Sequence, residues 1–320
     1  MYSDQKSSSN ESVLHALVSS YSELIEGLKA ASNGHSYFAH FLTPDWDSMN
    51  AQMKREHFSE IHKVYVLGIV ERCHIFSLTS LARTNSWLNS TVLQQSEKNL
   101  LGFSAALRGL LEATADTHDA ATVVVDQLYN YFPFIYLALE GSPYALPCPS
   151  LETLENKLIH YSYARRPVRG SEPLPWHTNK SNAEYIQAIE KSGASGVKEL
   201  YSLLCELTHP AARSVNCFLN EGDTEIVLDF GQDERIIGEI LEKYEGTIST
   251  LVTTTVNSAL VSLVILDKMG YGSAAPYPHY FSNLPGPTKI IRRIDEFLLK
   301  TQAEPFVFSE DMWHLQLVKP

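Results

Sequence analysis

Glu71 and His74 are the first residues whose types and spacing could do chemistry. They lie three positions apart in the apolar stretch "VYVLGIVERCHIFSLTSLA". On a helix this spacing places the two side chains about 60° apart, on one face. A lone carboxylate is costly to bury in such a helix, so it needs a partner or water. The pair therefore indicates either a structural ion-pair network that fixes the helix register or a functional site.

Arg108 and Glu112 are a second pair, four positions apart in a stretch with helical periodicity. Side chains at this spacing meet on the surface of a helix. They are either a solvent-exposed pair of small energetic value or an enclosed pair that meets Glu71 and Arg72. Because an enclosed charge needs a partner, we expect Glu71 or Arg72 to find its partner on the helix that carries Arg108 and Glu112.

His209 ends a helical stretch directly before Pro210. Proline suits the first turn of a helix better than its interior, so one helix ends here and another starts. An imidazolium would interact favourably with the negative end of the first helix. His209 is therefore either a capping histidine or a member of a site.

A di-iron carboxylate site is a competing hypothesis, because two E-x-x-H pairs occur on different predicted helices. Further glutamates could complete the ligand set. The residues available are Glu71, His74, Glu206, His209, Glu112, Glu239 and Glu242. His209 at a helix end is poorly placed for the centre of a bundle. The sequence therefore favours a protein with no metal site and no cofactor over the di-iron alternative.

Residues 164–180 are the only basic stretch that also contains an aromatic side chain. The side chains that could bind phosphate or RNA are Arg165, Arg166, Arg169, Trp176, His177 and Lys180. Guanidinium groups bind phosphate in a forked geometry, and an indole ring stacks on bases. The alternative is an ordinary solvated loop.

The composition and the net charge limit which of these functions the chain can have. The chain has 320 residues, 25 basic and 37 acidic, with a formal net charge of −12. This charge argues against broad, non-specific binding to nucleic acid or anionic membranes. The four cysteines form no C-x-x-C pair, and the first residues, "MYSDQKSSSNES", do not resemble a signal peptide. We therefore expect a cytoplasmic protein that does not insert into a membrane.

Helical periodicity predicts the elements that must position these residues. The expected helices cover residues 11–32, 50–86, 93–131, 151–163, 182–191, 196–207, 234–269 and 289–301, with one strand-like segment at 224–230. The expected fold is an all-α, multi-helix bundle with long antiparallel helices and at most one short strand pair. We expect an N-terminal helical extension at 1–45 and a bundle domain at 46–320. The uncharged polar face of the 234–269 helix favours a homodimer.

Six residues carry a resemblance to a known group of proteins. The chain has R-x-x-x-E in a long helix, then Y-x-x-L-[small]-x-x-x-H-P, then a long closing helix. The positions are Arg108, Glu112, Tyr201, Cys205 and His209-Pro210. Across residues 50–270 this order resembles an uncharacterised bacterial all-helical family that is loosely grouped with HEPN-like proteins. The resemblance implies a helical bundle, often dimeric, with roles in toxin–antitoxin systems or phage defence.

Active HEPN ribonucleases carry Arg-x(4–6)-His, in which the Arg and the His act on the scissile phosphate and the 2′-hydroxyl. Arg55 and His62 match this spacing, whereas Arg108 has no His at that distance. A fold that brings Arg108 and His209 together would supply the same two groups. We favour this second pairing, because Arg55 and His62 precede the enclosed part of their helix.

The favoured function is action on RNA or nucleotides in a bacterial defence or toxin–antitoxin setting. The residues expected to carry it are Arg108, Glu112, His209, Glu71 and His74. The alternatives are a non-catalytic helical interaction module that binds a protein partner, and the di-iron protein.

Overall fold

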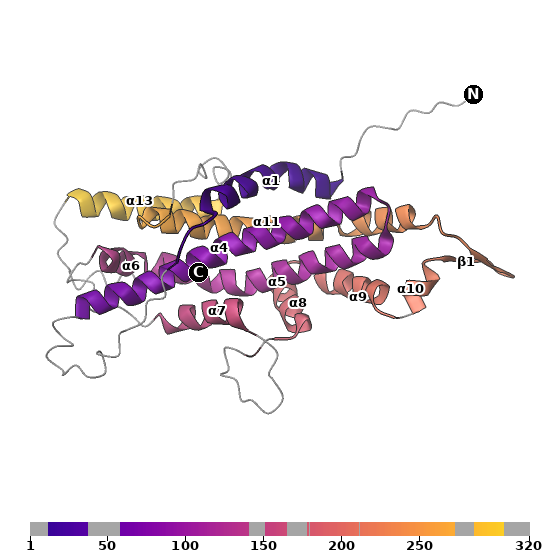
Figure 1. Ribbon diagram of the computed structural model, residues 1–320, viewed down its shortest axis with the longest axis horizontal. Coiled ribbons are helices and arrows are strands. Elements are labelled where there is room, and N and C mark those ends of the chain that lie inside the picture. The colour runs from indigo at the N-terminus through magenta and orange to yellow at the C-terminus, as the bar shows by residue number, and fades with distance from the viewer. Residues whose placement is uncertain are drawn as a thin grey trace, which may run out of the picture. The chain divides into compact units, whose positions relative to one another are not determined.

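The computed structural model describes residues 12–37, 58–140, 151–164, 178, 180–210, 212–272 and 285–303 (Figure 1). The helices of this part of the chain are α1 (Val13–Ser32), α4 (Phe58–Ser96), α5 (Leu100–Asn130), α6 (Phe132–Leu139), α7 (Glu152–Tyr163), α8 (Asn182–Lys191), α9 (Val197–Thr208), α10 (Ala212–Asn216), α11 (Asp233–Lys268) and α13 (Pro285–Ala303). The strands β1 (Leu219–Glu221) and β2 (Ile226–Leu228) pair antiparallel. The predicted all-α fold with at most one short strand pair is confirmed.

The boundary between α4 and α5 differs from the prediction, because α4 continues ten residues past residue 86. Asn, Ser and Thr side chains in its last turns donate hydrogen bonds to carbonyl oxygens one turn earlier, so these residues do not end the helix. The chain reverses at Lys98, which has a φ of 53°. Asn99 then caps α5, since its Oδ1 accepts a hydrogen bond from the Gly102 amide at 2.9 Å.

The chain forms two compact units, and each is assembled from three separate segments. Unit 1 draws on residues 1–30, 79–119 and 180–256, and unit 2 on residues 31–78, 120–179 and 257–320. The long helices α4, α5 and α11 therefore contribute residues to both units. The predicted boundary between residues 45 and 46 lies outside the described residues and stays a prediction.

The core of unit 1 contains one face of α9. Its buried residues Val197, Leu200, Leu204 and Leu207 recur at spacings of three and four, the period of an amphipathic helix. The residue before α9 is Gly196, whose φ of 83° lies in the left-handed region that glycine adopts without strain. This periodicity fixes which face of α9 points away from the core.

Polar contacts hold the first turn of α9 in unit 1. Both carboxylate oxygens of Glu190 accept hydrogen bonds from amides at this helix start, from Gly196 at 3.3 Å and from Lys198 at 2.9 Å. A negative charge at a helix N-terminus is favourable. Thr247 of α11 donates a hydrogen bond to the Ser195 carbonyl oxygen at 2.9 Å. These contacts fix the position of the polar face that α9 presents to α5.

In unit 2, the first part of α4 is buried along residues that include Val70, Cys73 and Phe76. Phe76 meets Tyr161 of α7 edge to face, with ring centroids 4.9 Å apart. Other contacts in this unit join α6 and α13, where the centroids of Phe132 and Phe297 are 5.8 Å apart.

Two of the described helical segments, His62–Ser96 and Asp233–Lys268, are long and apolar enough to cross a bilayer by length and composition alone. Of the apolar window in each, 56% and 67% is buried inside the protein. The core helix of a soluble protein has the same properties, so the expected absence of a membrane span stays a prediction.

Candidate functional site

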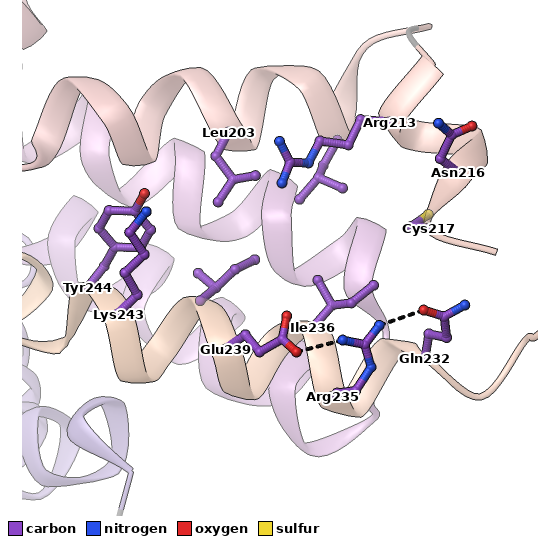
Figure 2. Close-up of a pocket in the computed structure, with 12 residues that line it drawn as sticks. Leu203, Arg213, Asn216, Cys217, Gln232, Arg235, Ile236, Glu239, Lys243 and Tyr244 are labelled. Carbon is purple, nitrogen blue, oxygen red and sulfur yellow. Dashed lines mark hydrogen bonds and ion pairs between the residues drawn. The ribbon is translucent and has the colours of Figure 1, made fainter. Parts of the chain in front are cut away.

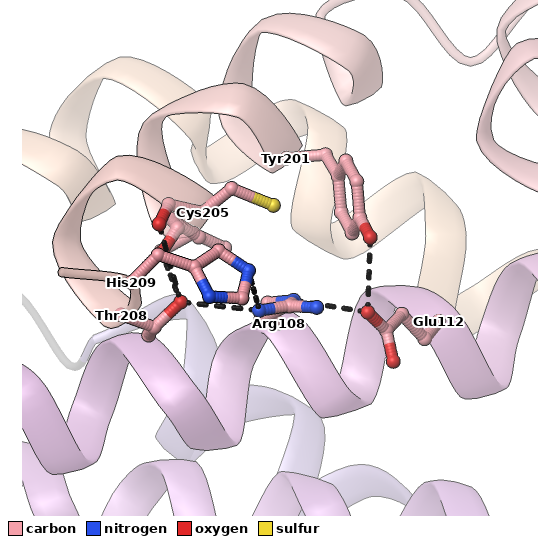
Figure 3. A network of polar contacts seen from close by, with 7 residues as sticks. Arg108, Glu112, Tyr201, Cys205, Thr208 and His209 are labelled. Atoms are coloured by element: carbon pink, nitrogen blue, oxygen red, sulfur yellow. Dashed lines mark hydrogen bonds and ion pairs between the residues drawn. The ribbon is translucent and has the colours of Figure 1, made fainter. Parts of the chain in front are cut away.

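Arg108 is the centre of a polar network between α5 and α9 in unit 1 (Figure 3). Its Nε donates to Glu112 Oε1 at 2.9 Å on the same helix. Its Nη1 lies 3.2 Å from Thr208 Oγ1 and 3.0 Å from His209 Nε2. The structure therefore brings Arg108 and His209 together, the pairing favoured from the sequence, while their catalytic role stays a prediction.

The contact with Arg108 sets the hydrogen-bonding role of one ring nitrogen of His209. A guanidinium group has only hydrogen-bond donors, so the ring nitrogen that faces it must be the acceptor. In this contact His209 Nε2 therefore acts as the acceptor. His209 is also solvent-exposed and follows the last residue of α9. Nε2 thus lies beside a positive charge at an exposed position.

Glu112 and Tyr201 complete the network. The Tyr201 hydroxyl donates to Glu112 Oε1 at 3.1 Å, so this oxygen accepts from both Tyr201 and Arg108. The guanidinium carbon lies 5.7 Å from the centre of the Tyr201 ring, within the range of a cation–π contact. The tyrosine therefore stabilises both members of the ion pair.

The pKa values of the network follow from these contacts. Partial burial raises the pKa of Tyr201, and the neighbouring Glu112 and Cys205 raise it further. For Arg108, burial acts to lower the pKa, but the hydrogen bond to Glu112 and the charges of Cys205, Glu112 and Tyr201 outweigh it, and the pKa is raised. Arg108 stays a cation and Tyr201 a protonated donor at neutral pH.

The network is partly exposed to solvent. The side chains of Arg108 and Glu112 are 23% and 29% exposed. No described residue accepts a hydrogen bond from Nη2 of Arg108, which leaves this group available to an anion. The arrangement can bind a phosphate through the guanidinium and accept a proton at His209.

Helix geometry explains which side chains meet. Arg108 and Glu112 are one turn apart on α5, and Tyr201, Cys205 and Thr208 follow the same face of α9. Thr208 was not anticipated from the sequence, although its spacing of seven residues from Tyr201 places it on that face. Its hydroxyl donates to the Leu204 carbonyl oxygen at 2.7 Å and so presents a lone pair to Arg108.

Glu71 and His74 belong to unit 2, whereas the Arg108 network belongs to unit 1. Both are buried on α4. The Tyr37 hydroxyl hydrogen-bonds to Nδ1 of His74 at 2.8 Å, and the His35 and Tyr271 rings lie with centroids 5.5 Å from that of His74. His74 therefore belongs to an aromatic and imidazole cluster, and a functional role for Glu71 and His74 stays a prediction.

Glu71 or Arg72 was expected to find its charge partner on the helix of Arg108 and Glu112. This expectation is wrong for Arg72, and for Glu71 it stays a prediction. Arg72 forms an ion pair with Glu155 of α7 at 3.2 Å, and Tyr65 also donates to this carboxylate. Arg108 and Glu112 instead pair with each other and with α9. The sequence could not separate these outcomes, because both Glu155 and Glu112 can reach an arginine on a neighbouring helix.

We expect His74 to make the protein less stable in mild acid. Burial lowers its pKa from the ordinary value of 6.5 to about 4, and the charge of His35 contributes. Between pH 6.5 and about 4, His74 is protonated in the unfolded chain but not in the folded chain. The free energy of unfolding therefore falls as the pH falls through this range. Urea denaturation at pH 7 and pH 5 measures this loss. A His74→Gln variant should lose part of the pH dependence, and an unchanged slope would contradict this assignment.

Most of the predicted nucleic-acid-binding loop lies outside the described residues. This applies to Arg165, Arg166, Arg169 and Trp176, as it does to His177 and Arg55. Lys180 is described: its ammonium contacts both carboxylate oxygens of Asp119 at 2.9 Å. His62 is buried, which lowers its pKa. RNA binding by the loop therefore stays a prediction.

The described residues contain no group of three or more His, Cys, Asp or Glu side chains that could hold a metal ion. All the residues of the di-iron hypothesis are described, so the fold does not assemble that ligand set. Glu206 and Glu239 instead form exposed ion pairs with Arg213 and Arg235.

Comparisons of the chain with protein-family models, with curated proteins and with solved structures find no match.

Proposed function

We propose that the site of Arg108 and His209 acts on phosphodiesters of RNA or nucleotides. The observation that carries this proposal is the 3.0 Å contact between Arg108 Nη1 and His209 Nε2 at an accessible surface. A fixed cation stabilises the charge that develops on a phosphate in the transition state, and a neutral imidazole accepts a proton. These are the two functions that RNA transesterification requires.

In the proposed reaction, a phosphate displaces His209 from Arg108 and binds Nη1 and Nη2 through its non-bridging oxygens. His209 Nε2 then accepts the proton of the 2′-hydroxyl. The 2′-oxygen forms a bond to phosphorus while the bond from phosphorus to the 5′-oxygen breaks. The departing 5′-oxygen takes a proton from water, which leaves a 2′,3′-cyclic phosphate and a 5′-hydroxyl.

Glu112 and Tyr201 are positioning residues in this proposal. Glu112 holds Nε of Arg108, so Nη2 can face the phosphate, and Nη1 can join it once His209 is displaced. Tyr201 fixes the carboxylate of Glu112 and lies against the guanidinium. A guanidinium whose orientation is already fixed loses less conformational entropy when substrate binds.

The biological setting follows from the resemblance to HEPN-like bacterial proteins. We propose a cytoplasmic protein with a role in defence or in a toxin–antitoxin system. The basic stretch at 164–180 would attract RNA locally, despite the formal net charge of −12.

RNA cleavage by the purified protein is the test. The wild type should convert single-stranded RNA into fragments that end in 2′,3′-cyclic phosphate, and its expression should slow bacterial growth. His209→Ala should lower cleavage by roughly 10²- to 10⁴-fold, because the proton acceptor is lost. Its melting temperature should change little, since His209 is exposed.

A matched control is His15→Ala, which changes a histidine on α1 outside the network. It should cleave RNA like the wild type. Intact RNA and normal growth with the wild-type protein would reject the proposal.

The second candidate is a non-catalytic interaction module in which the network only clamps α9 to α5. It is favoured by the direct links from the Arg108 guanidinium to Thr208 and His209 across the two helices. In that case His209→Ala alters stability or partner binding and no RNA cleavage occurs with any variant.

A further inference from the structure

The hairpin of β1 and β2 is an exposed apolar arm of unit 1. We define the β-arm as residues 218–230. All three residues of β2 are exposed, on both faces of the strand. Ile226, Leu228 and Phe230 are 67%, 66% and 74% exposed. Figure 1 shows the hairpin extending beyond the ends of α9 and α11. A two-stranded hairpin with an open apolar edge gains stability only when another surface covers it.

A hollow of about 370 Å³ lies at the base of the β-arm (Figure 2). Its apolar floor comes from Leu203 and Leu207 of α9 and from Ile236 and Ile240 of α11. One end is formed by residues directly beside the β-arm, at positions 216, 217 and 232. We name this hollow the root pocket.

The charges of the two surfaces differ in sign. The β-arm carries four carboxylates and no Lys or Arg. The root pocket is lined by three cations, Arg213, Arg235 and Lys243, and by one carboxylate, Glu239. The cations form ion pairs with glutamates in which both side chains are more than half exposed. Exposed pairs contribute only about 0–1 kcal/mol, so a carboxylate of the β-arm can replace a present partner.

Each of two copies of the chain can therefore supply the surface that complements the β-arm of the other. We propose that the protein forms a homodimer in which the β-arm of each copy enters the root pocket of the other. Ile226 and Leu228 would cover the apolar floor, while Asp223 and Glu225 would approach the cationic rim. In a two-fold dimer each copy would offer one arm and one pocket, so both contacts would form together.

Edge-to-edge pairing of the two β2 strands in the register centred on Val227 is less favourable. An antiparallel pair centred on Val227 would place Glu225 of one copy opposite Asp229 of the other. Like charges directly opposite each other destabilise a sheet. Exchange of the arms avoids this repulsion and buries the same apolar side chains.

Sedimentation velocity of the full chain tests the proposal. The wild type should form a dimer of twice the 35.9 kDa chain mass. The arm variant Ile226→Asp with Leu228→Asp should weaken dimerisation at least tenfold. The pocket variant Arg213→Glu with Lys243→Glu should do the same by repelling the β-arm. Leu93→Asp is the matched control, since Leu93 is an exposed leucine of α4 in unit 1 and should leave the dimer intact.

Mixing the two defective variants distinguishes arm exchange from other interfaces. The arm variant keeps its root pocket and the pocket variant keeps its β-arm, so the mixture retains one intact contact. The mixture should therefore associate more strongly than either variant alone, with circular dichroism confirming that both are folded. A monomeric wild type, a dimer that survives both sets of changes, or a mixture no stronger than its components would overturn the proposal.

Discussion

Arg108→Lys should lower RNA cleavage by about 10²- to 10³-fold, the usual cost of losing one charge-stabilising donor group at a reacting centre. Lysine keeps the positive charge but has no planar fork, so it cannot hold Glu112, Thr208 and a phosphate at once. In the present structure Nε and Nη1 of Arg108 already bind Glu112 and the end of α9. The loss should appear mainly in kcat, because the charge is needed most in the transition state.

Single-turnover cleavage of a labelled RNA measures this effect, and thermal unfolding shows whether the variant is folded. Arg83→Lys is the matched control. Arg83 belongs to the same unit and forms an ion pair with Asp116 at 2.7 Å, outside the network. Equal losses for the two lysine variants would mean that Arg108 has no special part in the reaction.

Phe103→Ala should lower the free energy of unfolding by about 3–5 kcal/mol, the range for removing a buried aromatic side chain. Phe103 is fully buried on α5, five residues before Arg108. Its loss leaves a cavity in unit 1 that rigid helices cannot fill by small shifts. Urea denaturation followed by circular dichroism measures the change.

Leu101→Ala provides the comparison, because Leu101 lies two positions away on the same helix and is 39% exposed. This substitution should lower the free energy of unfolding by less than about 1 kcal/mol. The Leu101 side chain is already partly exposed in the folded protein, so unfolding exposes little more of it. A cost for Phe103→Ala below that of Leu101→Ala would contradict the burial of this face of α5.

The local pattern of apolar and polar residues predicts several helices of this chain well. The period of apolar residues predicts helices at 182–191 and 196–207, and the structure has α8 and α9 there, within one residue at each end. His209 was expected to end its helix, and it directly follows α9. Such features depend on side chains within one or two turns, so the sequence alone carries them.

Some helix boundaries depend on residues that the apolar pattern does not reveal. The division between α4 and α5 contains neither glycine nor proline and rests on the left-handed Lys98 and the capping Asn99. A helix that continues through Ser and Thr residues can be recognised only when their hydroxyls are seen to bond to the preceding turn. Sequence periodicity weakens in such polar turns, and the predicted helix was therefore too short.

The pattern of residue types along the chain is enough to predict the all-α class, the pairing of Arg108 with Glu112 at one helical turn and the position of His209 at a helix end. Which helices meet depends on how they pack in three dimensions. Arg108 and His209 are 101 positions apart, and their contact depends on the packing of α9 against α5. In the same way, Arg72 pairs with Glu155 across 83 positions. Helix periodicity fixes the direction of a side chain around its own axis, whereas the partner is set by the shape and burial of the whole core.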